Sequence, residues 1–180
     1  MTILLIIINM LIPPPDSSYT IDFGENKSGK EWVVVVDGVM GGLSSSTSLI
    51  ADNTLSFKGN ISLENNGGFA SLRGPKNDQD YSDYTKLEIR YRSKGQAFGI
   101  RFLKYEQFFM PYLKKSFTET SWEWTTVTVS LDEFKEYILN NERSKIVDAN
   151  DFKDISRMGL IVSNKKEGDF EIEIDYIKLF

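Results

Sequence analysis

Hydrophobic and polar residues alternate with a period of two along much of the chain, a pattern typical of strands with one buried face. In residues 86–92 and 170–175, apolar side chains alternate with charged ones. In residues 98–102 they alternate with Gly99 and Arg101. The alternation in the last segment changes sense near Tyr176, which predicts a β-bulge. Several strands of an antiparallel sheet are therefore expected.

A second group of strands is indicated by β-branched runs and by the turn signals between them. Residues 32–36, Trp-Val-Val-Val-Val, form an apolar run that predicts a strand buried on both faces. Further strands are expected at 43–50, 54–63, 68–73, 112–117, 122–130 and 157–163. Dipeptides such as Asp52-Asn53 and Glu167-Gly168 separate them. Many short strands with frequent turns predict an antiparallel β-sandwich.

One segment has the pattern of a helix. Ser130 and Glu133 have the spacing of a capping box, and Phe134, Tyr137 and Ile138 would then share one helix face. The expected fold class is accordingly all-β, with a single short helix. One sandwich domain is expected to span residues 19–180, because no shift in composition indicates a second domain.

Residues 1–18 differ from the rest of the chain. Residues 2–12 are apolar except for Asn9, and Pro13–Pro15 end any helix that they begin. Eleven helical residues span roughly 16 Å, about half of a bilayer core, so we expect no transmembrane span here. The segment lacks the preceding basic residue and the small-residue cleavage site of a secretory signal. A remnant signal and a segment that packs on the domain both stay open.

Composition narrows the chemistry that the chain can perform. The sequence has no His and no Cys, which excludes Ser-His-Asp triads, Cys-His nucleophiles and metal sites built on imidazole or thiolate. Its 21 basic and 26 acidic residues give a net charge of −5, so nucleic acid is not an expected partner. A non-catalytic binding or structural domain is favoured over an enzyme, for which carboxylates, Lys and Tyr would remain.

Two segments are richer in glycine and amides than sheet formation requires. Residues 37–42 read Asp-Gly-Val-Met-Gly-Gly, and residues 64–68 read Glu-Asn-Asn-Gly-Gly. Two interpretations stay open: paired tight turns, or two loops that lie together and form one binding surface. The candidate partner- or ligand-binding residues in these segments are Asp37, Gly41, Gly42, Glu64, Asn65 and Asn66.

These segments also carry a resemblance to a known family. Trp32 with the Asp-Gly-Val-Met-Gly-Gly segment, the Phe57–Ser71 segment with its Asn-Asn-Gly-Gly, and the closing residues 168–177 together resemble the complex I intermediate-associated protein 30 family. The resemblance extends over roughly residues 31–180. It implies a galactose-binding-like jelly roll and no catalytic residues.

The family resemblance also implies partners. It favours a protein partner, such as a membrane-complex assembly client served in an assembly or chaperone-like role. In bacterial relatives it implies carbohydrate or protein binding. Because residues 1–18 are neither Arg-rich nor amphipathic, a mitochondrial location is disfavoured, and a bacterial cytoplasmic and an exported or periplasmic location both stay open.

Nine aromatic residues between positions 98 and 124 suggest a carbohydrate-binding alternative. Tyr105, Phe109 and Trp122 are the candidates for stacking on sugar rings. A third, weaker hypothesis is a glycosidase that uses carboxylates such as Glu64, Asp37 and Glu106. We expect no cofactor. The acidic run at 78–82 lacks the Gly and Glu of an EF-hand, which leaves only a structural calcium ion open.

Overall fold

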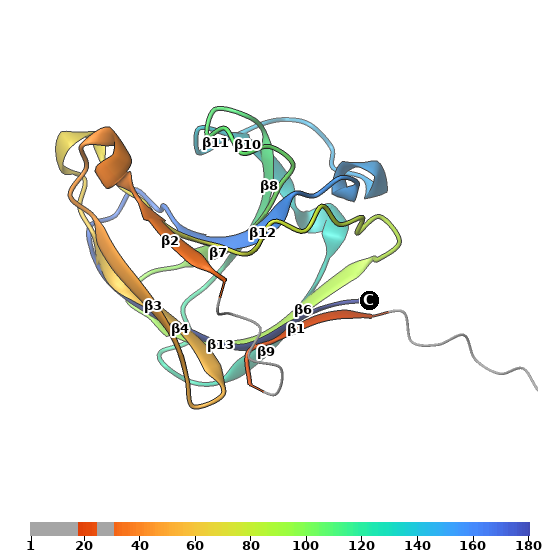
Figure 1. Cartoon of the computed structure of the whole chain (residues 1–180), viewed down its shortest axis with the longest axis horizontal. Helices are drawn as coiled ribbons and strands as arrows, with labels where there is room; N and C mark the ends of the chain where they lie inside the picture. The colour runs from red at the N-terminus through yellow and green to blue at the C-terminus, as the bar shows by residue number, and fades with distance from the viewer. Residues whose placement is uncertain (1–17, 25–30) are drawn as a thin grey trace, which may run out of the picture.

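The chain folds into two antiparallel sheets that pack face to face (Figure 1). The computed structural model describes residues 18–24 and 31–180. The strands are β1 Tyr19–Asp22, β2 Val33–Val36, β3 Ser45–Ala51, β4 Thr54–Ile61, β5 Ala70–Arg73, β6 Lys86–Lys94, β7 Phe98–Leu103, β8 Tyr112–Phe117, β9 Thr125–Ser130, β10 Lys135–Ile138, β11 Asn141–Glu142, β12 Arg157–Val162 and β13 Gly168–Leu179. Four 3-10 turns connect them: η1 Asp37–Met40, η2 Glu64–Asn66, η3 Leu131–Glu133 and η4 Ala149–Phe152.

The six-stranded sheet is organised around its long strand, β13. The strand order is β3-β4-β13-β6-β9, and β1 pairs with the far end of β13, beyond the residues that pair with β4. The pairing of β13 with β6 shifts in register between Ile174 and Tyr176, which confirms the expected bulge. Asp175, at this bulge, accepts a hydrogen bond from the backbone N–H of Phe23 through its carbonyl oxygen.

The seven-stranded sheet has the order β11-β10-β8-β7-β12-β5-β2. It is strongly curved, and its two ends rise on either side of β7 and β12 (Figure 1). One end carries η1 and η2, and the other carries the β10–β11 hairpin. This curvature gives the sheet a concave face directed away from the core.

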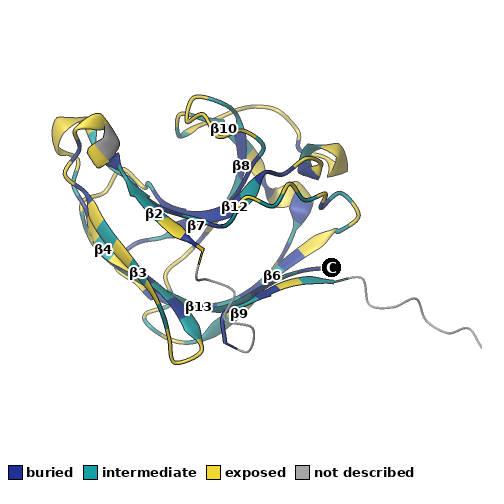
Figure 2. Ribbon diagram, viewed as in Figure 1, coloured by how far each residue is buried: buried dark blue, intermediate teal, exposed yellow. Residues whose placement is uncertain are grey.

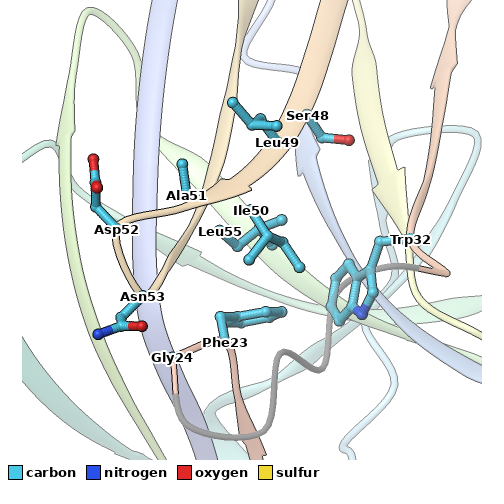
Figure 3. A pocket seen from close by; sticks show the side chains of 10 residues that line it. All are labelled: Phe23, Gly24, Trp32, Ser48, Leu49, Ile50, Ala51, Asp52, Asn53 and Leu55. Atoms are coloured by element: carbon cyan, nitrogen blue, oxygen red, sulfur yellow. The ribbon is translucent and has the colours of Figure 1, made fainter.

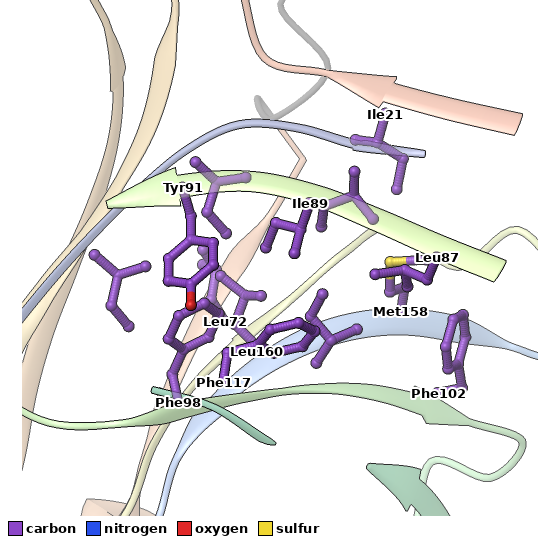
Figure 4. Packing of buried hydrophobic residues seen from close by; sticks show 14 of the residues in the cluster. Ile21, Leu72, Leu87, Ile89, Tyr91, Phe98, Phe102, Phe117, Met158 and Leu160 are labelled. Carbon is purple, nitrogen blue, oxygen red and sulfur yellow. The ribbon is translucent and has the colours of Figure 1, made fainter. Parts of the chain in front are cut away.

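The core lies between the two sheets and is rich in aromatic side chains (Figures 2 and 4). Tyr91 of β6 meets Phe98 of β7 edge-on, with ring centroids 5.1 Å apart. Leu87, Ile89 and Tyr91 are buried, as their alternation predicts, while the residues between them are partly exposed. The predicted all-β sandwich is therefore confirmed, and its inward residues are those that the period of two selects.

The helix expected after Ser130 does not form. The capping box is present, because Glu133 accepts from the backbone N–H of Ser130, but it closes only the 3-10 turn η3. The chain then turns at Phe134 and continues as β10, which pairs with β8. Pairing with a sheet edge satisfies the backbone that a helix would otherwise satisfy internally, so tertiary context outweighs the local signal.

Two strand environments also differ from the sequence prediction. The apolar run at Val33–Val36 forms an edge strand with Val33 exposed, and it is not buried on both faces. Conversely, every residue of β7 is buried, including Gly99 and Arg101 on the face expected to be solvated. The reason is the curvature of the sheet, because the rims of its concave face shield β7 at the bottom.

The apolar segment predicted at residues 1–12 and the prolines that follow it lie outside the described residues. In the part that is described, no helix has the length and apolar character needed to cross a bilayer.

Candidate functional site

A groove of about 800 Å³ occupies the concave face of the seven-stranded sheet. Its floor comes from β5, β7, β8 and β12. Three segments form its rims: the β7–β8 loop, the η1–η2 end and the β10–β11 turn. Its volume lies in the range of pockets that hold small-molecule ligands.

The β7–β8 loop presents exposed aromatic side chains to the groove. Tyr105 is 45% exposed, Phe108 60% and Phe109 55%. The rings of Phe108 and Phe109 meet edge-on with centroids 5.5 Å apart. Glu106 connects this loop to β12 through a salt bridge with Arg157. Oε1 of Glu106 lies 2.8 Å from Nη2 of Arg157. The hydrogen bond from Arg157, opposed in part by burial, lowers the pKa of Glu106 from its ordinary value.

Arginines lie on the floor of the groove. Arg101 of β7 is only 6% exposed and donates to the hydroxyl of Ser71 on β5. Arg73 lies on β5 and is half-buried. The Arg101 guanidinium lies 5.8 Å from the ring centroid of Tyr112, whose hydroxyl donates to Oδ1 of Asn140 across 2.8 Å. The groove thus combines aromatic walls with a cationic, hydrogen-bonding floor.

The two glycine-rich loops meet at one end of the groove, where the buried carboxylate of Asp37 joins them. Asp37 is 1% exposed, and its Oδ2 accepts from the backbone N–H groups of Gly68 (2.6 Å) and Phe69 (3.1 Å). Ser44 donates to Asp37 through both its backbone N–H (3.0 Å) and its hydroxyl (2.5 Å). Burial acts to raise the pKa of Asp37, but these hydrogen bonds outweigh it and the pKa is lowered. We call this arrangement the Asp37 clamp.

The glycines of both loops are explained by the clamp. A Cβ on Gly42 would lie 2.4 Å from Cγ of Asp37, and a Cβ on Gly67 would lie 2.8 Å from its Oδ2. The remaining glycine of each pair has a positive φ, 89° at Gly41 and 126° at Gly68. One glycine of each pair therefore admits the carboxylate, and the other turns the backbone around it.

Seven of the nine predicted site residues fall into two groups. Asn66, Tyr105 and Phe109 line the groove, so the structure brings them together. Asp37, Gly41, Gly42 and Asn65 belong to the junction of the loops, where Asn65 Nδ2 donates to the Gly41 carbonyl across 3.2 Å. Asp37 is thus a correction: it was expected to offer hydrogen bonds to a partner, but both its oxygens bind its own chain. Glu64 is exposed and is not among the groove-lining residues.

Trp122 lies on the other sheet, so the expected platform with Tyr105 and Phe109 does not form. Trp122 and Trp124 precede β9 and cover the outer face of β6. The Arg92 guanidinium lies 4.5 Å from the Trp122 ring centroid, and Lys94 Nζ lies 4.4 Å from it. Both cations also pair with glutamates of β13. Trp122 therefore packs on a row of ion pairs between β6 and β13.

Sequence reasoning missed Arg73, Arg101 and Tyr112 as groove residues. The signal available for Arg101 was a lone cation on the non-core side of a strand, between Gly99 and Leu103. Such a residue is expected on any solvated face, and only the curvature of the sheet turns it into part of a floor.

The other chemistries considered are not assembled in the described residues. The three carboxylates suggested for a glycosidase occupy separate environments, since Asp37 is clamped, Glu106 binds Arg157 and Glu64 is exposed. Over residues 18–24 and 31–180, no three acidic side chains gather so as to hold a metal ion. Asp80, in the run considered for calcium, accepts from the backbone N–H of Ser82.

A second hollow, of about 810 Å³, lies beside the β3–β4 turn (Figure 3). Its walls combine the core side chains Phe23, Trp32 and Leu55 with the turn residues Asp52 and Asn53. The groove carries more aromatic and charged side chains than this hollow does, so we take the groove as the candidate site.

Comparison with known structures supports the sandwich fold. A family 11 carbohydrate-binding module from Clostridium thermocellum, solved with a beta-1,3-1,4-mixed-linked tetrasaccharide, matches with a TM-score of 0.63 and 19% identity, covering 91% of this chain and 95% of that one. The family 11 module of a cellulosomal cellulase of the same organism matches with a TM-score of 0.64 and 15% identity, covering 90% and 94%. At these identities the likeness concerns the fold.

Comparison with curated protein sequences finds no match. The family model for complex I intermediate-associated protein 30 matches residues 21–174, which include both glycine-rich loops, the groove and most of β13. The chain therefore belongs to the complex I intermediate-associated protein 30 family.

Proposed function

We propose that this chain is a non-catalytic binding domain whose ligand is a carbohydrate chain held in the groove. The observation that carries the proposal is the combination of exposed aromatic rings with polar groups on one concave face. Sugar rings have apolar faces that stack on aromatic side chains and hydroxyls that need hydrogen-bond partners. The fold shared with family 11 carbohydrate-binding modules supports the same function by analogy.

The polar groups of the groove suit hydroxyls. Asn66, Asn140 and Asn141 lie on opposing rims, and an amide both donates and accepts. Tyr105, Phe108 and Phe109 lie on a third segment, the β7–β8 loop. A chain of a few sugar rings lying in the groove would contact all three segments at once. Binding between opposing walls is expected to favour an internal stretch of polysaccharide.

The test is a titration of neutral and acidic oligosaccharides into the purified protein by calorimetry. We expect Phe109→Ala to weaken binding about tenfold, because a stacked ring is worth about 0.5–1.5 kcal/mol beyond its buried area. Trp122→Ala, on the opposite sheet, is the matched aromatic control and should bind like the wild type. Equal affinities of Phe109→Ala and wild type would place the ligand elsewhere.

A protein client is the second candidate function, favoured by family membership and by apolar side chains exposed around the same groove. Met40, Leu63, Phe108, Phe109 and Leu139 all line the groove and are exposed. Affinity purification with wild type beside Phe108→Ala would test it. A client protein that is lost in the variant and is not displaced by oligosaccharide would favour the assembly role over carbohydrate binding.

A further inference from the structure

A row of paired residues that crosses four strands contains three cations, two of which, Arg73 and Arg101, line the floor of the groove. Arg73 of β5 pairs in register with Gly159 of β12, which pairs with Arg101 of β7, which in turn pairs with Lys114 of β8. Residues directly opposite in antiparallel strands point to the same face. Arg73 and Arg101 therefore flank Gly159, a position without a side chain, and both arginines line the groove.

Neither arginine forms a salt bridge in the described part of the chain, although the charge of Glu106 acts on Arg73 from a distance. Arg101 donates to one hydroxyl, that of Ser71, and its buried Nε has no partner. The buried Nε of Arg73 has none either. Arg90, Arg92 and Arg157, by contrast, each pair with an acidic side chain. A guanidinium buried as deeply as that of Arg101 is unusual without an acidic partner, because a partner of opposite charge normally compensates its desolvation.

Electrostatics at the floor agree with the geometry. Burial, with a further contribution from the charge of nearby Arg73, lowers the pKa of Arg101 to about 10, so it stays cationic at neutral pH. Among the residues that the structure describes, the groove lining includes Arg73, Arg101 and Lys165 and one acidic side chain, Glu106, which is bound to Arg157. The chain as a whole has a formal net charge of −5. The groove is thus a positive site on an acidic protein.

We propose that the sugar chain held in this groove contains a uronic acid, whose carboxylate binds Arg73 and Arg101. The inference rests on the proposed carbohydrate-binding function and names the class of sugar. A planar carboxylate accepts two parallel hydrogen bonds from a guanidinium, and here it would complete the unpaired donors of both arginines. The aromatic walls would stack on the neighbouring rings while the acid is held at the floor.

The experiment compares acidic oligosaccharides with their carboxyl-reduced counterparts, so that the members of each pair differ only in whether a carboxylate or a neutral hydroxymethyl group is present. The panel contains oligomers of galacturonate, glucuronate and mannuronate, each beside its reduced form, together with a sulfated neutral glucan. Affinities are measured by calorimetry at low and at high salt. We expect at least one uronate oligomer to bind tenfold or more tightly than its reduced form, with the preference shrinking in high salt.

Two variants test whether that preference depends on the arginines at the floor of the groove. Arg101→Gln and Arg73→Gln should each abolish the preference for the acidic form, because each weakens binding of the acidic form at least about tenfold more than binding of the reduced form. Arg73 is the less buried of the two, so it preserves the test if Arg101→Gln fails to fold. Arg90→Gln, on the outer face of the other sheet, is the matched control and should keep the preference.

The outcomes separate the inference from the function on which it rests. If acidic and reduced forms bind equally, the carboxylate inference is wrong and the carbohydrate-binding function stands. If the sulfated glucan binds through both arginines and the uronates do not, the floor takes a sulfate and the inference is again wrong. If the folded protein binds no member of the panel, both proposals are overturned.

Discussion

Replacing Asp37 by Asn tests whether one carboxylate joins the two glycine-rich loops. The substitution preserves the shape of the side chain but removes its charge and turns one acceptor into a donor. Oδ2 accepts from Ser44, Gly68 and Phe69, while Oδ1 accepts from the Ser44 backbone. In either orientation, the new amide NH₂ group faces at least one buried backbone N–H.

The expected cost follows from these contacts. A hydrogen bond to a charged group contributes about 1.5–3 kcal/mol and a neutral one about 0.5–1.5 kcal/mol. Removing the charge therefore costs about 1 kcal/mol per bond, and an unsatisfied N–H adds about 1–3 kcal/mol. Because neighbouring terms are not additive, we expect Asp37→Asn to destabilise the fold by about 3–5 kcal/mol. For a domain of this size, that corresponds to a melting temperature lower by about 10 °C.

Urea unfolding followed by circular dichroism measures this difference, with Asp52→Asn, in the exposed β3–β4 turn, as the matched control. Because the folded-state pKa of Asp37 is lowered, its contribution is complete above the unfolded value of about 3.9 and is lost as the pH falls through the folded value. The difference in free energy of unfolding between wild type and Asp37→Asn should accordingly become smaller below pH 4. If the free energy of unfolding of Asp37→Asn at pH 7 lies within about 0.5 kcal/mol of that of wild type, the Asp37 clamp does not stabilise the fold.

Three further predictions concern Gly42 beside the Asp37 clamp, Arg101 on the floor of the groove and Trp122 on the outer face of the other sheet. Gly42→Ala should destabilise by about 2–4 kcal/mol in urea unfolding, because its Cβ would meet Asp37, whereas Gly38→Ala, with only a contact at 3.8 Å, should cost less than about 1 kcal/mol. Arg101→Met should unfold at a urea concentration equal to or above that of wild type, since it removes an unpaired buried charge; a loss above about 2 kcal/mol would contradict this. Trp122→Ala should lower stability by about 1 kcal/mol through lost cation–π contacts, and a shift below about 0.3 kcal/mol would show that they contribute little.

Sequence reasoning succeeds where a strand has one face towards the core and the other towards solvent. Leu87, Ile89 and Tyr91 alternate with charged residues, and the sheet buries them in that order. The same reasoning fails for Arg101, because burial there depends on the curvature of a sheet whose strands come from distant parts of the chain. The period of two specifies which residues share a face, but it carries no information on whether that face is flat or concave.

For a similar reason, the sequence predicts the position of only some of the residues that line the groove. Turn and aromatic patterns point to Asn66, Tyr105 and Phe109, and all three line the groove. The same aromatic pattern points to Trp122, which lies on the other sheet, because sequence spacing does not reveal which sheet a strand joins. The partnership of Asp37 with Gly68 and Phe69 spans more than thirty positions, which local patterns cannot predict.

The central place of β13 has a consequence for how the protein is made. This strand pairs with β4 and β1 on one side and with β6 on the other, so three segments from early and middle parts of the chain depend on it for backbone hydrogen bonds. During synthesis they must wait until residues Gly168–Leu179 leave the ribosome. Until then, β4 and β6 present apolar strand edges to other chains. The domain is therefore expected to fold in one cooperative step once β13 has emerged, with its greatest tendency to aggregate before that point.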